Sequence, residues 1–69
     1  MERFLKDNGF IKMRKREKEL YGIFRHPQTG TVVKIYNNGD FSVSKTGESS
    51  MEHVEFWGCR IKEYLEDIE

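Results

Sequence analysis

The fold of this chain is decided by the stretch Thr31-Val32-Val33-Lys34-Ile35-Tyr36-Asn37-Asn38-Gly39-Asp40-Phe41-Ser42-Val43-Ser44. Apolar and polar residues alternate on both sides of its centre, which is the two-residue period of a half-buried strand. In the first run Val33 and Ile35 share one face, and in the second run Phe41 and Val43 do. The Asn-Gly pair between the runs favours a tight turn, because both residue types tolerate positive φ. The stretch therefore predicts a β-hairpin.

The residues before this hairpin indicate a short helix and further strands. Met1, Phe4 and Leu5 have helical spacing, and the Asn-Gly pair at positions 8–9 ends that helix. From residue 11 the period changes to two, which favours a strand with one covered face. Residues 20–25 are rich in aromatic and β-branched types, and the turn at 26–30 contains proline and glycine. A continuous helix over residues 11–24 is the competing interpretation.

A polar linker follows the hairpin, and a long helix is expected from about residue 51 to residue 68. Its apolar stripe consists of Met51, Val54, Trp57 or Gly58, Ile61, Tyr64 or Leu65, and Ile68. Ser49 lies three residues before Glu52, which is the spacing of a capping box. A mid-helix glycine costs about 1 kcal/mol relative to alanine. We expect close approach of the helix to the sheet to compensate for Gly58.

These elements predict a single α+β domain spanning residues 1–69. A short N-terminal helix, a three- or four-stranded antiparallel sheet and a long C-terminal helix follow in that order, with both helices packed on one face of the sheet. Five Phe, three Tyr and one Trp argue against disorder. A chain of 69 residues has little room for a deep catalytic cleft, so a binding module is the default expectation.

Several classes of protein and site are disfavoured by the sequence. No stretch approaches 18 apolar residues and the first residues lack the apolar run of a signal peptide, so we expect a cytoplasmic protein without a membrane partner. Cys59 is the single cysteine, which excludes an intramolecular disulfide. His26 and His53 lack the spacing of metal ligands, so neither a metal nor another cofactor is expected. We expect an exposed His26 in its turn and a half-buried Cys59.

The net charge of zero conceals an asymmetry along the chain. Residues 1–36 hold nine Lys or Arg against four acids, and residues 37–69 hold three against eight. The first half can form a basic patch for phosphates, with Tyr21 and Phe24 as a stacking surface for bases. The proposed members of this patch are Lys12, Arg14, Lys15, Arg16, Lys18 and Arg25. The alternative is a charged strand edge that resists aggregation.

The C-terminal helix carries acids on its outer face. They either form a solvated face or bind a basic surface on another protein. The proposed partner-binding residues are Glu55, Glu63, Glu66 and Asp67. Pairing of this acidic helix with the basic strands of another copy makes a homodimer a further hypothesis.

Three segments of the chain resemble the opening of HicA (YcfA-like) toxins. They are Phe4-Leu5-Lys6-Asp7-Asn8-Gly9-Phe10, Ile23-Phe24-Arg25-His26-Pro27 and Thr31-Val32-Val33-Lys34-Ile35. The resemblance covers about half of the chain and implies a helix, three-strand, helix fold similar to double-stranded-RNA-binding domains. HicA proteins cleave mRNA and carry Gly-Ser-His before their second strand. The corresponding residues here are Glu19-Leu20-Tyr21, so the resemblance supports the fold and argues against the activity.

The sequence therefore favours a small non-enzymatic regulator or inhibitor that binds a host protein that handles nucleic acid. The absence of alanine beside frequent Lys, Glu and Ile is associated with phage or mobile-element proteins. Direct binding of RNA or DNA by the basic patch is the first alternative. A ribonuclease with His26 as general acid or base is the second alternative.

Overall fold

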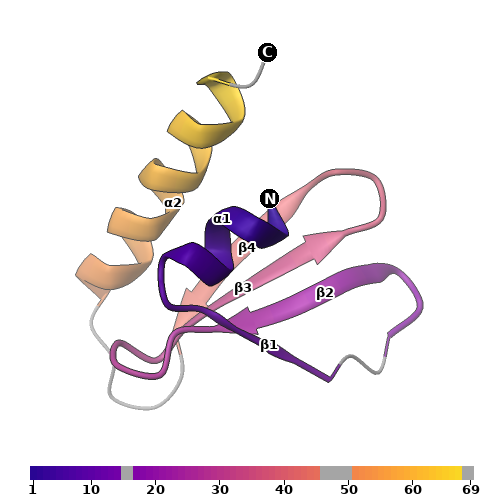
Figure 1. Ribbon diagram of the computed structural model, residues 1–69, viewed down its shortest axis with the longest axis horizontal. Helices are drawn as coiled ribbons and strands as arrows, with labels where there is room; N and C mark the ends of the chain where they lie inside the picture. The colour runs from indigo at the N-terminus through magenta and orange to yellow at the C-terminus, as the bar shows by residue number, and fades with distance from the viewer. Residues whose placement is uncertain (15–16, 46–50, 68–69) are drawn as a thin grey trace.

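The computed structural model describes residues 1–14, 17–45 and 51–67 (Figure 1). Its elements are α1 (Glu2–Asp7), β1 (Ile11–Met13), β2 (Leu20–Arg25), β3 (Thr31–Tyr36), β4 (Phe41–Lys45) and α2 (Met51–Asp67). The strands form one antiparallel sheet in the order β1-β2-β3-β4. The α+β class and the four-strand version of the sheet are confirmed. The competing helix over residues 11–24 is wrong, because this region holds two paired strands.

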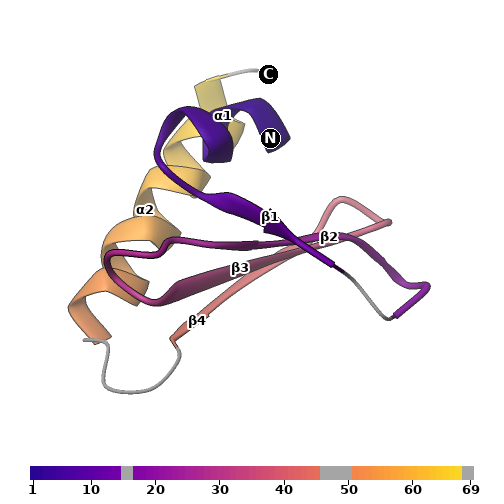
Figure 2. The same ribbon diagram turned by 60° about the horizontal axis from the view of Figure 1, so that its bottom comes forward.

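Both helices cover the same face of the sheet. In Figure 2, α1 and α2 lie on one side, and no helix of the described ranges lies on the other. The core joins Leu5 of α1 and Trp57 and Ile61 of α2 to Phe24 and Val33 of the sheet. Since a two-turn helix is marginal in isolation, α1 depends on this packing for its stability. The predicted two-layer arrangement is confirmed.

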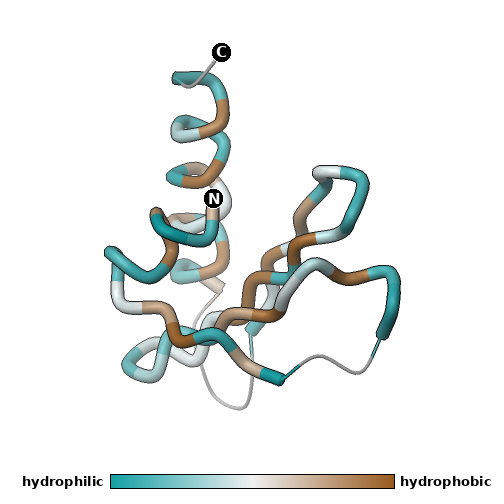
Figure 3. Tube along the Cα trace, turned by 45° about the vertical axis from the view of Figure 1, so that its right-hand side comes forward, coloured by the Kyte–Doolittle hydropathy of each residue, from teal (hydrophilic) through white to brown (hydrophobic). Residues whose placement is uncertain are grey.

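Glycines with positive φ lie at the turns of the chain. Gly9 takes a φ of +91° where α1 ends, and the Phe10 amide donates to the Leu5 carbonyl at 2.9 Å. In the β3–β4 turn only Gly39 has a positive φ among the described residues from 36 to 40. The Tyr36 amide donates to the Asp40 carbonyl at 2.8 Å, so the loop has three residues. The tight turn predicted at the Asn-Gly pair thus uses the positive-φ tolerance of Gly39 and not that of Asn38. Figure 3 shows hydrophilic residues at the turns and apolar ones in the strands.

A β-bulge in β2 changes the direction of Tyr21. Leu20 pairs with Tyr36, whereas Gly22 pairs with Ile35, so Tyr21 is an extra residue on its strand. A bulge of this kind interrupts the alternation of side chains. The Tyr21 hydroxyl donates to Glu2 of α1 at 3.0 Å, so Tyr21 reaches toward the helices.

The pairing of β1 reverses the expected orientation of this strand. Lys12 lies opposite Phe24, which is fully buried beneath the helices. Opposed residues of an antiparallel pair share a face, so Lys12 lies on the covered side. Ile11 and Met13 consequently lie on the uncovered side, although the alternation alone suggested that they were covered. The sequence shows the period of a strand but not which face its partner covers.

Helix α2 differs from its predicted stripe in detail. Trp57 and Ile61 are buried, but Met51 is exposed. A Cβ placed on Gly58 would meet nothing within 4 Å, so the expected close approach of the helix to the sheet is wrong. Cys59 is exposed, not half-buried. The predicted cap Ser49 and the last stripe residue Ile68 lie outside the described residues.

Neither described helix combines the length and the apolar character that a bilayer span requires.

Candidate functional site

The side of the sheet that faces away from both helices is here termed the open face. The strand pairing aligns Ile11, Arg25, Val32 and Ser44 in one row across the four strands. A second row is formed by Met13, Ile23, Lys34 and Ser42. Tyr36 lies on the same face, two residues beyond Lys34 on β3. The open face thus combines aliphatic, cationic and small polar side chains.

The β1 side of the open face is apolar and exposed. Ile11 is 56% exposed and Met13 is 44% exposed, although both lie on an edge strand. Met13 lies opposite the half-buried Ile23, so these aliphatic side chains form one patch. Edge strands usually carry charges or proline to prevent association. β1 has such protection in Lys12 and in its length of three residues, so its exposed aliphatic patch is a candidate surface for contacts through the face of the sheet.

The charges of the strands have one sign. The four strands as described contain four cationic residues and no acid: Lys12, Arg25, Lys34 and Lys45. Two of them, Arg25 and Lys34, lie on the open face, next to the aliphatic patch. The described acids lie in the two helices and in the turns at residues 17–19 and 40. The separation of positive and negative charge along the sequence therefore becomes a separation between a cationic sheet layer and a more acidic helix layer.

The basic patch predicted from the sequence is not assembled as one surface. Arg14, Lys18 and Arg25 are exposed, but Lys18 precedes one end of β2 and Arg25 is at the other end. Six strand residues span about 20 Å. Lys12 lies on the covered side, and Lys15 and Arg16 lie outside the described residues. Of the predicted members, Arg25 alone is placed within the open face by the pairing of the described strands.

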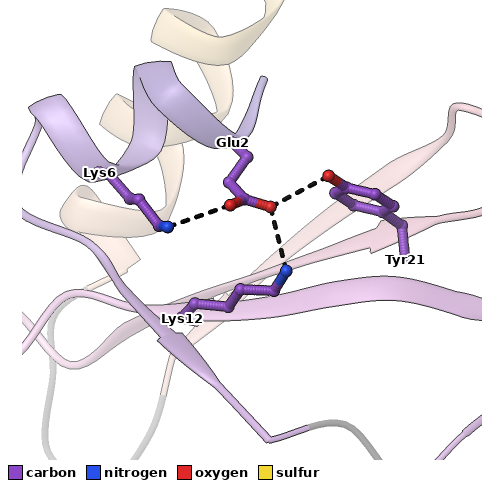
Figure 4. A network of polar contacts seen from close by, with 4 residues as sticks. All are labelled: Glu2, Lys6, Lys12 and Tyr21. Carbon is purple, nitrogen blue, oxygen red and sulfur yellow. Dashed lines mark hydrogen bonds and ion pairs between the residues drawn. The ribbon is translucent and has the colours of Figure 1, made fainter.

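Lys12 is held by a network at the Glu2 carboxylate. Glu2 accepts hydrogen bonds from the Nζ atoms of Lys6 and Lys12, each at 3.1 Å, and from the Tyr21 hydroxyl (Figure 4). The Lys12 ammonium also lies 5.3 Å from the centre of the Tyr21 ring. Hydrogen bonds from Lys6, then from Lys12 and Tyr21, lower the pKa of Glu2 from 4.5 to about 2. This network ties α1 to β1 and β2 and places the exposed Lys12 ammonium on the helix side of the sheet, away from the open face.

The expected stacking surface for bases is not assembled on the open face, because Phe24 is buried and the 47%-exposed Tyr21 lies on the helix side of the sheet. Phe24 is fully buried in the core, and the Tyr21 hydroxyl is bonded to Glu2. Tyr36 is half-buried beside the β3–β4 turn and is the aromatic side chain that β3 contributes to the open face. The open face is therefore mainly aliphatic between its cations, which differs from the aromatic platforms that bind single strands.

The predicted acidic residues of α2 are exposed but divide into two groups. Glu63 and Asp67 line a shallow hollow of about 240 Å³ between α1 and α2, together with Phe4, Arg60 and Tyr64. The Phe4 and Tyr64 rings in this lining stack with centroids 4.4 Å apart. Glu55 and Glu66 are exposed outside this hollow. These acids lie on the helix layer, away from the open face.

His26 is buried, which contradicts its expected exposure in the turn. It is 8% exposed and packs against Phe10 and Trp57, with centroid distances of 5.1 and 5.4 Å. Its Nδ1 atom is buried and has no hydrogen-bond partner within the described part of the chain. The ring thus contributes to an aromatic cluster in the core. The described residues also contain no group of three or more His, Cys, Asp or Glu side chains placed to hold a metal ion.

Sequence reasoning missed the aliphatic part of the open face. The alternation in β3 already separated Val32, Lys34 and Tyr36 from the core side. That pattern was the available signal for the β3 part of the face. The contribution of Ile11 and Met13 depends on their pairing with β2, which the local sequence does not contain.

No family model, curated protein or solved structure matches this chain. The similarity to HicA toxins therefore stays a prediction from the sequence, and functional inference depends on the geometry of the chain itself.

Proposed function

We propose that this protein is a non-enzymatic binding module that regulates or inhibits a partner protein through its open face. The observation that carries this proposal is the exposed aliphatic patch of Ile11 and Met13 beside Arg25 and Lys34. Apolar area gives affinity when it is removed from water, and single-sign charges around it give specificity and faster association. The expected partner surface is apolar with an acidic rim.

The chemistry of the face favours a protein partner over a nucleic acid. Backbone phosphates would suit Arg25 and Lys34, but bases stack on aromatic side chains. Ile11, Met13 and Ile23 are aliphatic, and the predicted stacking residue Phe24 is buried. Direct nucleic-acid binding remains the second candidate function, favoured by the acid-free strands. The burial of His26 gives no support to a ribonuclease that uses this residue.

The test compares two charge reversals of equal size in a tagged chain. Arg25→Glu with Lys34→Glu alters the open face, and Arg3→Glu with Lys62→Glu alters exposed positions on the helices. Each chain is used to capture partners from a lysate treated with nuclease. We expect a defined protein to remain bound to the wild type and the helix variant but not to the open-face variant. Capture that is unaffected by the open-face variant contradicts the proposal.

A second arm measures nucleic acid directly. Fluorescence anisotropy with single-stranded and duplex oligonucleotides at low and moderate salt reports any phosphate-driven binding. Salt-sensitive binding that is lost with Arg25→Glu and Lys34→Glu, together with no protein captured after nuclease treatment, would establish the second candidate function instead.

A further inference from the structure

We propose that the partner places an acidic amphipathic helix of about three to four turns across the open face, completing a three-layer arrangement. This inference rests on the proposed function and specifies the part of the partner that binds.

The dimensions of the open face suit one helix. Four strands spaced about 4.8 Å apart span about 14 Å between the outer strands. The diameter of a helix with its side chains is about 10–12 Å. Leu20 at the start of β2 pairs with Tyr36 and is fully buried, so the free length of β2 is its remaining five residues. They extend about 16 Å, the length of about 11 helical residues. The covered face already packs helices on this sheet, with Trp57 and Ile61 of α2 against it.

The apolar patch lies along one side of this footprint. Met13 and Ile23 are direct neighbours across β1 and β2, and Ile11 lies two residues along β1. Val32 is the diagonal neighbour of Ile23 on β3. Apolar residues at i, i+3, i+4 and i+7 of a helix form a stripe that covers such a patch.

The two cations of the face have a spacing that a helix can match. Arg25 lies opposite Val32, and Lys34 is two residues beyond Val32, so the two cations are diagonal neighbours. Diagonal neighbours in a sheet are about 7–8 Å apart. Acids at i and i+4 of a helix have Cβ atoms about 5–6 Å apart, and long side chains close the difference. Arg25 lies between Ile11 and Val32 in its row, so a helix whose aliphatic stripe is flanked by two acids can contact the patch and both cations.

A second copy of the chain fits this face less well. Two open faces in contact would bring Arg25 and Lys34 near the same cations of the other copy, which is repulsive. Helix α2 of another copy would present Glu55 and Glu66, with Cys59 between them on the exposed side. That side would offer acids to the cations, but it also carries Lys62, and its exposed Met51 lies at the start of the helix, so it lacks a continuous stripe for Ile11, Met13 and Ile23.

A strand added to β1 is a poorer occupant than a helix. β1 is the edge strand next to the aliphatic patch and spans only three residues, so a strand added to it would gain few backbone hydrogen bonds. Such a strand would also lie three strand spacings from Lys34 on β3, too far to contact this cation.

The test uses designed peptides of 14 residues and the full chain, followed by NMR of the protein's methyl groups. The first peptide carries a leucine stripe flanked by glutamates at i and i+4. The second has lysines in place of the glutamates, and the third has a central proline that prevents a continuous helix. We expect the first peptide to shift the methyl signals of Ile11, Ile23 and Val32 in a saturable manner and to gain helical circular dichroism.

Matched variants connect this binding to the cations. We expect Arg25→Glu with Lys34→Glu to raise the Kd for the acidic peptide at least about tenfold, because attraction becomes repulsion. Arg3→Glu with Lys62→Glu should change it less than about twofold, since these exposed charges lie on the helix layer and are screened. The lysine and proline peptides should each bind at least about tenfold more weakly. The amide spectra of both variants verify that they are folded.

The contrary outcomes are distinct from a failure of the proposed function. Equal binding of the proline peptide, or shifts confined to α2 or β4, would overturn the helix inference. If no peptide binds but capture of a partner still depends on Arg25 and Lys34, the proposed function stands and the helix inference is wrong. If neither peptide binding nor partner capture depends on Arg25 and Lys34, the helix inference and the proposed function are both wrong.

Discussion

We expect the substitution Gly22→Ala to destabilise the fold, because Gly22 lies beneath the ring of a core residue. A Cβ at this position would be 3.0 Å from Cε1 and 3.3 Å from Cζ of Phe24, and 3.5 Å from Cε of Lys12. Phe24 is fully buried among Leu5, Val33 and other core side chains, so its ring has little space to move. The methyl group must therefore displace packed atoms.

The expected size follows from two opposing effects. Adding a methyl group to a packed core costs about 1–3 kcal/mol. Removing a glycine from a strand recovers about 0.5–1 kcal/mol of conformational entropy. The net loss should lie between about 0 and 2.5 kcal/mol, with a central value of about 1 kcal/mol. For a domain of this length 1 kcal/mol changes Tm by about 4–8 °C, so the central expectation is a variant that melts about 4–8 °C lower.

Gly58→Ala is the matched control, because the added atom is the same and the surroundings are different. A Cβ at Gly58 would meet nothing within 4 Å, and the residue lies inside α2. Alanine is favoured over glycine in a helix by about 1 kcal/mol. This variant should therefore melt about 4–8 °C higher than the wild type.

The assay is thermal unfolding of the wild type and both variants, followed by circular dichroism, with urea unfolding to verify the free-energy differences. Opposite signs for the two substitutions are the expected result. A Gly22→Ala variant as stable as the wild type would refute the argument that Phe24 is immobile above Gly22. A destabilised Gly58→Ala variant would refute the open space at that position.

Three further predictions concern the first residue of α1 and one residue on each of the buried and exposed faces of α2. Glu2→Gln should lower the free energy of unfolding above pH 4.5, and the difference from the wild type should shrink as the pH falls from 4.5 toward 2, because Glu2 with its lowered pKa stabilises the fold only while its carboxyl is charged. Urea unfolding across this pH range measures the difference, and a difference that is independent of pH contradicts the prediction. Ile61→Ala should cost about 2–5 kcal/mol, since Ile61 is fully buried, and a loss below 1 kcal/mol in denaturant unfolding would conflict with this packing. The exposed thiol of Cys59 should react with a thiol reagent in the native protein as completely as in urea, and protection in the native state would show that it is covered.

The local sequence was sufficient for the elements and their order. The alternation in residues 31–36 and 41–44 and the glycine at 39 specify a hairpin, since period and turn chemistry act over a few residues. The helical spacing of Trp57 and Ile61 likewise identified the buried side of α2. Met51 at the helix start was assigned to the same stripe, but it is exposed, because a stripe does not show how far the sheet beneath it extends.

The candidate site depended on contacts between residues that are distant in the sequence. Tyr21 was a candidate for stacking because of its neighbours, but the bulge in β2 and the Glu2 carboxylate turn it toward the helices. His26 was expected in solvent because it precedes a proline in a turn, but Phe10 and Trp57 enclose it. Neither outcome has a signal within the segment itself.

The sequence by itself determined a helix, a set of antiparallel strands, a second helix and a strong separation of positive and negative charge. Only the tertiary structure decided that Ile11 and Met13 are left in solvent and that Lys12 is turned toward Glu2. The physical reason is the two-residue period of a strand, which offers two equivalent faces. The register of Lys12 against Phe24 selects between them, and it thereby places the aliphatic patch next to Arg25 on the open face.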